Sequence, residues 1–178
     1  MRIDPSLAEA QSNLGQFLLE QGRAREAFPH CREAVRLRPE FPEAHNNLGN
    51  VFRDLGQLPE ARECYAEALR LNPDLAMTYN NMGQALQEEN SLDDALAWYQ
   101  RALQLDPNSA RIHTNAASLL AEQEKYDDAL AGYRRALELD PTWGEAHCGI
   151  GGVRHEQGHF EQAQTSWSTG GECCRCVC

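Results

Sequence analysis

Apolar residues recur along the chain at the spacing of amphipathic helices, in short segments separated by turn residues. Proline punctuates these segments at a constant spacing of 34 residues, at Pro5, Pro39, Pro73, Pro107 and Pro141. A fixed period between 20 and 50 residues is typical of repeat architectures. The pattern predicts helices near residues 6–21, 24–37, 42–55, 59–71, 76–89, 93–105, 110–123, 127–139, 144–157 and 160–168.

Small residues stand at the same two places in every repeat. On the first helix of each pair they are Gly15, Gly49, Gly83, Ala117 and Gly151, and on the second Ala27, Ala61, Ala95, Ala129 and Ala163. A second-helix position that is mostly aromatic follows, occupied by Cys31, Tyr65, Tyr99, Tyr133 and Trp167. Small residues at facing positions let two helices approach closely, and larger ones fill the gaps between them. The pattern therefore predicts pairs of antiparallel helices.

The turns within the pairs carry residues that tolerate a left-handed backbone, namely Gly22, Gly56, Asn90 and Gly158. Glu124 stands at this place in the fourth repeat, so we expect its turn to be the least ideal. Pro29 lies several residues inside a predicted helix, where we expect a late helix start or a kink.

The clearest copy of the repeat spans residues 42–75, with Leu48, Gly49, Phe52, Ala61, Tyr65, Ala68 and Pro73 at characteristic places. This pattern resembles the tetratricopeptide repeat (TPR). The resemblance implies an all-α, right-handed superhelical TPR solenoid of antiparallel helix pairs. It predicts the end of a preceding repeat at 1–7, five repeats at 8–41, 42–75, 76–109, 110–143 and 144–169 (the last truncated), and a disordered cysteine-rich tail at 170–178.

Asparagine recurs at the sixth position of four successive repeats, at Asn13, Asn47, Asn81 and Asn115, and Gly149 interrupts this column. Further amides flank it at Asn46, Asn50, Asn80 and Gln84. Asparagine is a mediocre helix former, so its repetition needs a reason. The resemblance to TPR proteins implies that these positions line a concave face, where amides can pair with the backbone of an extended peptide. Alternatively, the amides bridge neighbouring repeats and bind nothing.

The asparagine column and the segment EAHNNLGN at 43–50 resemble the superhelical array of O-linked N-acetylglucosamine transferases. In that family the ladder binds peptide backbone, and similar repeats occur in bacterial TPR scaffolds. Nothing in the chain resembles the glycosyltransferase domain, so catalysis is not implied. The sequence therefore predicts a protein- or peptide-binding scaffold. The alternatives are a substrate-recognition fragment of such a transferase and a module that self-associates through uncapped terminal repeats.

Charge restricts the partners that the chain can bind. The 16 basic and 27 acidic residues give a formal net charge of −11, which disfavours nucleic acid and anionic membranes as partners. The thirteenth repeat position is acidic throughout, at Glu20, Asp54, Glu88, Glu122 and Glu156. This column favours basic peptides or is simply a solvated face. Few basic residues occupy the positions that a carboxylate-binding TPR clamp requires, so acidic peptide tails are not expected ligands.

The remaining sequence features do not indicate a membrane protein, an enzyme or a metal-binding protein. No apolar run is long enough to span a membrane and no secretory signal is visible, so we expect a cytoplasmic protein. His147, Cys148, His155 and His159 lie near the cysteine-rich tail, and the spacing of His155 and His159 would suit a metal on one helix. Gly158 interrupts that helix and the tail lacks paired Cys-x-x-Cys spacing, so a structural zinc site is not expected. No catalytic grouping or phosphate-binding loop is present. We therefore expect neither an enzyme nor a cofactor.

Overall fold

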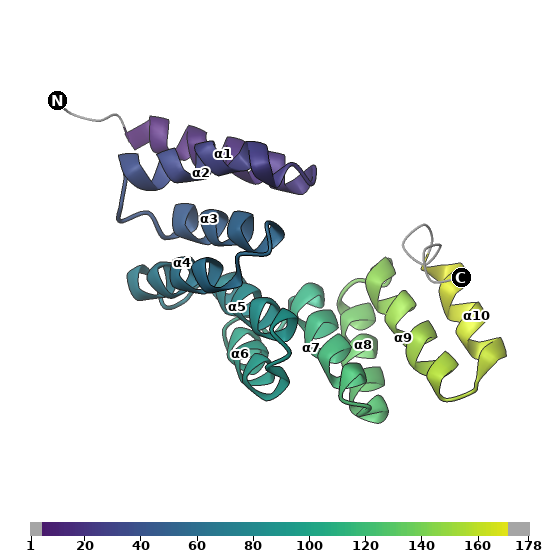
Figure 1. Cartoon of the computed structure of the whole chain (residues 1–178). Coiled ribbons are helices and arrows are strands. Elements are labelled where there is room, and N and C mark those ends of the chain that lie inside the picture. The colour runs from purple at the N-terminus through teal and green to yellow at the C-terminus, as the bar shows by residue number, and fades with distance from the viewer. Residues whose placement is uncertain (1–4, 171–178) are drawn as a thin grey trace. The chain divides into compact units, whose positions relative to one another are not determined.

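The computed structural model describes residues 5–170, and all regular secondary structure within them is helical (Figure 1). The helices are α1 (Pro5–Glu20), α2 (Ala24–Leu37), α3 (Pro42–Asp54), α4 (Leu58–Leu71), α5 (Ala76–Glu88), α6 (Leu92–Leu105), α7 (Ala110–Glu122), α8 (Tyr126–Leu139), α9 (Gly144–Glu156) and α10 (Phe160–Thr169). The predicted bounds agree with these within one residue, because proline, glycine and the apolar period mark each end.

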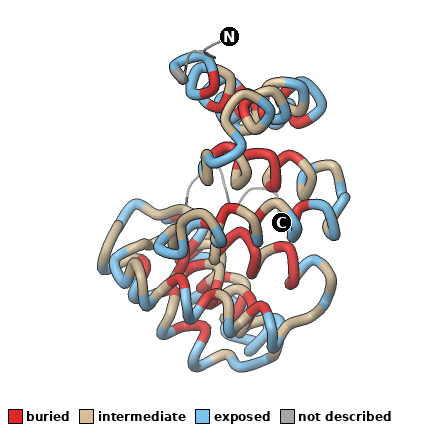
Figure 2. Tube along the Cα trace, turned by 90° about the vertical axis from the view of Figure 1, so that its left-hand side faces the viewer, coloured by how far each residue is buried: buried red, intermediate tan, exposed pale blue. Residues whose placement is uncertain are grey.

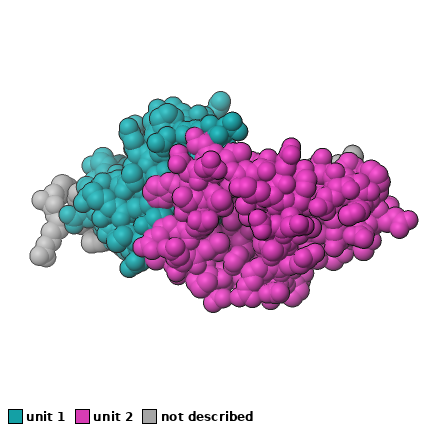
Figure 3. Space-filling model, turned by 90° about the horizontal axis from the view of Figure 1, so that it is seen from below, with its two compact units in different colours: residues 1–90 teal, residues 91–178 magenta. Residues whose placement is uncertain are grey.

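The chain divides into two compact units, residues 1–90 and 91–178 (Figure 3). In unit 1, α1 packs against α2 and α3 against α4, the first helices α1 and α3 touch, and α5 contacts α3 and α4. In unit 2, α7 pairs with α8 and α9 with α10, while α6 packs on α7 and the first helices α7 and α9 touch. The predicted all-α fold of helix pairs is confirmed in the part of the chain that the structure describes.

The predicted small residues lie where the paired helices meet. The second-helix alanines are all fully buried, at Ala27, Ala61, Ala95, Ala129 and Ala163. A Cβ added to Gly49 would lie 2.5 Å from Cε1 of Tyr65, too close for any side chain. In the same way, a Cβ added at Gly15 would clash with the side chain of Cys31, and a Cβ added at Gly151 would clash with that of Trp167. Figure 2 shows the resulting core as short buried stretches that recur in the helices.

Cys31 is one of these core residues, as its position in the large column predicts. It is fully buried, and burial raises the pKa of its thiol to about 12.

The turns within the pairs adopt left-handed conformations at the five expected residues. The φ values are 68° at Gly22, 75° at Gly56, 62° at Asn90, 59° at Glu124 and 79° at Gly158. Glu124 has a side chain that disfavours this region, so the fourth turn is indeed the least ideal.

The prediction of a late start at Pro29 is wrong, because α2 begins at Ala24 and runs through the proline. The buried face of α2, which includes Ala27 and Cys31, holds the helix in place although proline removes one of its hydrogen bonds.

The loops between pairs repeat one hydrogen-bonding arrangement. In three of these loops the side chain before the proline accepts a bond from the backbone N–H two residues on, as when Asp140 Oδ1 accepts from Thr142 N at 2.9 Å. The same bond occurs at Asn72 and Asp106, at 3.1 and 3.2 Å. The bonds from Thr142 lower the pKa of Asp140.

A histidine on the following helix also closes three of these loops onto the proline carbonyl. The Nε2 atoms of His45, His113 and His147 lie 2.8, 3.0 and 3.1 Å from the carbonyl oxygens of Pro39, Pro107 and Pro141. The loops at Pro107 and Pro141 therefore carry both contacts.

Two predictions fall partly outside the described residues. These are the end of a preceding repeat at 1–7, of which residues 1–4 are not described, and the cysteine-rich tail at 170–178, of which only Gly170 is described. Among the described helices, none is both long and apolar enough to cross a membrane.

Candidate peptide-binding face

Two of the three sixth-position asparagines in unit 1, Asn47 and Asn81, lie between consecutive first helices. Asn47 and Asn81 are each only 7% exposed. Asn47 Nδ2, on α3, donates to Ser12 Oγ of α1 at 3.0 Å. Asn81 Nδ2, on α5, donates to the Oδ1 atoms of Asn46 and Asn50 on α3, at 3.0 and 2.9 Å. These two amides bridge neighbouring repeats, as the alternative interpretation of the column requires.

The bridge determines how the flanking amides are oriented. Asn46 Oδ1 also accepts from Thr78 Oγ1 at 3.0 Å, and Asn50 Oδ1 accepts from the buried Tyr65 hydroxyl at 2.8 Å. Both carbonyl oxygens therefore already accept hydrogen bonds from within the protein. The Nδ2 groups of Asn46 and Asn50 have no hydrogen-bond partner among the described residues, and both side chains are half-buried. They are oriented donors at the surface of α3.

Asn80 and Gln84 extend this network along α5. Asn80 is fully buried, and its Nδ2 lies 3.3 Å from Asn81 Oδ1 and 3.4 Å from Gln84 Oε1. Arg53 Nη1 donates to the same Gln84 oxygen at 2.7 Å. Asn80 therefore supports its neighbours from inside, whereas Gln84 is half-buried and retains its own amide donor.

The other two asparagines of the column have different surroundings. Asn13 is exposed on α1, and its side chain makes no hydrogen bond within the described residues. Asn115 is half-buried on α7 in unit 2. Unit 1 thus brings six of the eight predicted residues together on α3 and α5, while the exposed Asn13 of α1 lies outside that network.

The acidic column is partly neutralised in unit 1. Arg53, at the twelfth position, lies 3.1 Å from Asp54 Oδ1 and 3.8 Å from Glu88 Oε1. Burial raises the pKa of Glu88 in spite of this arginine. Arg53 therefore links the acidic column to Gln84 and the amide network.

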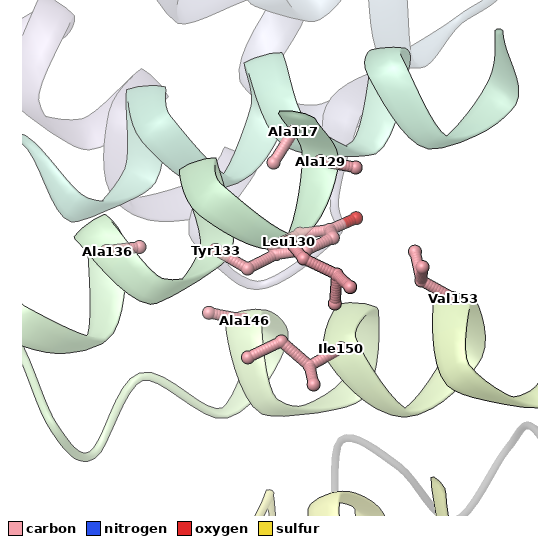
Figure 4. Close-up of a cluster of buried hydrophobic side chains, with 8 residues drawn as sticks. All are labelled: Ala117, Ala129, Leu130, Tyr133, Ala136, Ala146, Ile150 and Val153. Atoms are coloured by element: carbon pink, nitrogen blue, oxygen red, sulfur yellow. The ribbon is translucent and has the colours of Figure 1, made fainter. Parts of the chain in front are cut away.

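Unit 2 departs from this arrangement around Tyr133 of α8. In the fourth repeat the usual first-helix glycine is replaced by Ala117, whose Cβ would lie 2.9 Å from a Cβ added at Gly132. The Tyr133 ring lies against Gly149 of the following repeat, where an added Cβ would be 2.7 Å from the phenol oxygen. Figure 4 shows Tyr133 with Ala117 on one side and the α9 residues Ala146 and Ile150 on the other. Gly149 interrupts the asparagine column because the ring occupies that space.

A pocket of about 410 Å³ opens beside this ring, among α7, the turn after it, α8 and α9. Its lining includes the carboxylates of Glu122, Glu124 and Glu156, and the rings of Tyr126 and Tyr133. The pocket was not predicted from the sequence, although the break at Gly149 was its signal. No group of three or more metal-ligating side chains occurs among the described residues, so these carboxylates do not form a metal site there.

The comparisons with known proteins agree with this architecture. The family model described as "Tetratricopeptide repeat" matches residues 6–71, 40–108 and 74–142. No curated protein sequence matches the chain significantly.

Several solved structures share the fold. TTC0263, a thermophilic TPR protein of Thermus thermophilus, is 21% identical with a TM-score of 0.84, covering 92% of this chain and 89% of its own. PilF of Pseudomonas aeruginosa is 23% identical with a TM-score of 0.81, covering 93% and 77%. YrrB, described as a TPR protein with an unusual peptide-binding site, is 22% identical with a TM-score of 0.63, covering 90% and 82%. Since the family model covers well over half of the sequence, the chain belongs to the tetratricopeptide repeat family.

Proposed function

We propose that this protein is a scaffold that binds an extended peptide or protein segment on the first helices of its repeats. The observation that carries the proposal is the pair of oriented, unpartnered amide donors of Asn46 and Asn50. An extended segment presents backbone carbonyl oxygens along its length, and these are suitable acceptors for such donors.

The network suits this role because it positions the donors in advance. Asn81 holds the oxygens of both Asn46 and Asn50, so their amide groups need not be ordered when a ligand binds. Preorganisation lowers the entropic cost of binding. In this proposal Asn47, Asn80 and Asn81 position the contacting groups, while Asn46, Asn50 and Gln84 reach the ligand. Asn13 and Asn115 are placed at equivalent repeat positions and are proposed as further contacts.

The function can be tested without a known partner by selecting peptides from a displayed random library against the whole chain. The decisive variants are Asn46→Asp and Asn50→Asp. Aspartate keeps the oxygen that accepts from Asn81, together with Thr78 at position 46 or Tyr65 at position 50, but removes the unpartnered N–H groups. We expect each lost donor to weaken a selected peptide by about 0.5–1.5 kcal/mol, or roughly two- to tenfold.

The matched control is Gln57→Glu, which adds the same charge in a turn away from the network. It should leave peptide binding unchanged. The proposal is wrong if no peptide is selected, or if both aspartate variants bind selected peptides as tightly as the parent while remaining folded.

Self-association is a second candidate function, favoured by apolar side chains exposed at both ends of the repeat series. Leu7, Leu14 and Phe17 are 47%, 42% and 55% exposed, and their spacing places them on one side of α1. On α10, Phe160 is 63% exposed. We propose that α1 of one copy contacts α10 of another, a head-to-tail arrangement that generates chains rather than closed dimers.

Sedimentation velocity at increasing protein concentration tests this second candidate. The parent chain should form oligomers of growing size, and Leu14→Glu with Phe17→Glu should abolish them because a charge cannot be buried cheaply at such a contact. A monomer at every concentration would exclude self-association through these surfaces.

A further inference from the structure

We propose that the pocket of unit 2 receives an arginine side chain of a bound peptide or protein segment. The inference rests on the proposed function, since the pocket occupies first-helix positions of the same kind as those that carry the amides in unit 1. It adds a sequence preference in unit 2 to a function whose proposed contacts in unit 1 are to peptide backbone.

Two glycines of α9 line the pocket, and Gly152 leaves its space open whereas the Tyr133 ring fills the space at Gly149. Gly149 and Gly152 stand at the sixth and ninth repeat positions, which hold Asn115 and Ser118 in the preceding repeat. A Cβ added at Gly152 would meet nothing within 4 Å, so this glycine opens directly into free space. The volume of about 410 Å³ lies within the usual range of ligand pockets and accommodates a long side chain.

The charge of the lining selects a cation. Glu122, Glu124 and Glu156 contribute three carboxylates, and no lysine, arginine or histidine is among the lining residues. Glu124 and Glu156 form no ion pair within the described residues. In unit 1 the corresponding acidic residues share Arg53, but Ala121 stands at that repeat position here. An arginine from a ligand would supply a guanidinium to Glu124 and Glu156.

The geometry favours an extended organic cation over a metal ion. The carboxylates do not gather into a group that could hold a metal. A guanidinium can instead donate to separated carboxylates through its several N–H groups. It also stacks on aromatic rings, and the half-buried Tyr126 provides one beside the largely covered ring of Tyr133. Burial raises the pKa of the Tyr133 hydroxyl, so it remains a neutral phenol.

The experiment uses the whole chain and a minimal probe, N-acetyl-Gly-Arg-Gly-amide, titrated to millimolar concentration while amide NMR signals are recorded. The control probe carries citrulline, which has nearly the same shape as arginine but no charge. We expect the arginine probe to shift amides of residues 118–126 and 149–156 at concentrations where the citrulline probe does not. Equal shifts from both probes, or none from arginine, would overturn the proposal.

Two kinds of variant test the pocket itself. Gly152→Leu fills the space with a better helix former, so the melting temperature should hold or rise while the arginine-dependent shifts disappear. Glu124→Gln and Glu156→Gln should each weaken the probe by about 1.5- to 5-fold, the range for partly exposed ion pairs. Glu145→Gln, at an exposed position in the first turn of α9, is the matched control and should change nothing.

A third probe, spermidine, identifies the source of the cation. If spermidine shifts the same amides at far lower concentration than the arginine peptide, the pocket binds free polyamines and the peptide assignment is wrong. Undiminished binding by Gly152→Leu and both glutamine variants would also overturn it. In either case selected peptides that still depend on Asn46 and Asn50 would leave the proposed function intact, so the two failures are distinguishable.

Discussion

Replacing Asn81 by alanine should destabilise the protein, whereas the same replacement at Asn13 in the same repeat column should stabilise it. Asn81 is buried and donates to both Asn46 and Asn50 at 3.0 and 2.9 Å. Asn13 is exposed, and its side chain has no partner in the described part of the chain. The two sites share a repeat position and a chemical change, so they differ mainly in what the amide contacts.

The magnitudes follow from these contacts. The two hydrogen bonds that Asn81 donates contribute about 0.5–1.5 kcal/mol each, so their loss costs about 1–3 kcal/mol. Asn80, which also donates to Asn81, keeps Gln84 Oε1 as an acceptor. Alanine recovers about 0.5 kcal/mol as the better helix former. The net effect at Asn81 is a loss of about 0.5–2.5 kcal/mol. At Asn13 only the helix term applies, and we expect a gain of about 0.5 kcal/mol.

Urea unfolding followed by far-ultraviolet circular dichroism measures both free energies, and hydrogen exchange assigns the change to helices. With Asn81→Ala, amides of α3 and α5 should exchange faster, because the lost bonds join these two helices. The reasoning would be refuted if Asn81→Ala proved as harmless as Asn13→Ala. It would also be refuted if the loss in exchange protection spared α3 and α5.

Two further predictions concern the core. Gly149→Ala should lower the free energy of unfolding by about 1–3 kcal/mol, because it forces a Cβ against Tyr133. Ala117→Gly should be less damaging in that background than in the parent, because it gives the ring room to move. A double-mutant cycle without coupling would contradict this. Burial holds the Cys31 thiol pKa at about 12, above about 8.5 in an unfolded chain, so unfolding releases a proton and stability should fall as pH rises above about 8.5. Cys31→Ala should lose less stability than the parent between about pH 8 and pH 10 in thermal melts under reducing conditions.

Much of the helical architecture could be predicted from the sequence because its determinants are local and repeated. Gly49 and Tyr65 already indicate a close helix pair, and Glu124 at a glycine place already indicates a strained turn. The residue types found at one repeat position therefore indicate the environment of that position in every repeat.

The candidate site was less accessible to sequence reasoning, since it depends on where neighbouring repeats place their side chains. The sequence shows a polar column at Asn47 and Asn81. The orientation of these two side chains, however, is set by their hydrogen bonds to Ser12, Asn46 and Asn50 in the preceding repeats. The same amide can bridge helices or face a ligand with no change in its own sequence context. The proposal therefore shifts the contacts from Asn47 and Asn81 to Asn46, Asn50 and Gln84.

The pocket depends on departures from the repeat pattern at several positions of three helices. Ala117 departs from glycine on α7, Gly132 departs from larger residues on α8, and Gly149 and Gly152 depart from polar residues on α9. Each departure alone reads as a tolerated substitution. Only the packing of Tyr133 shows that they form one arrangement.

The packing of Tyr133 on Gly149 restricts how repeats can be added to or removed from the array. Tyr65 packs on a glycine of its own repeat, so the fit of that ring travels with a single repeat when it is copied or deleted. Tyr133 packs on a glycine of the next repeat, so the fourth repeat is compatible only with a successor that has glycine at the sixth position. A tandem copy of residues 110–143 would place an asparagine against the ring. Duplication at this point would therefore be tolerated only if the last two repeats were copied together.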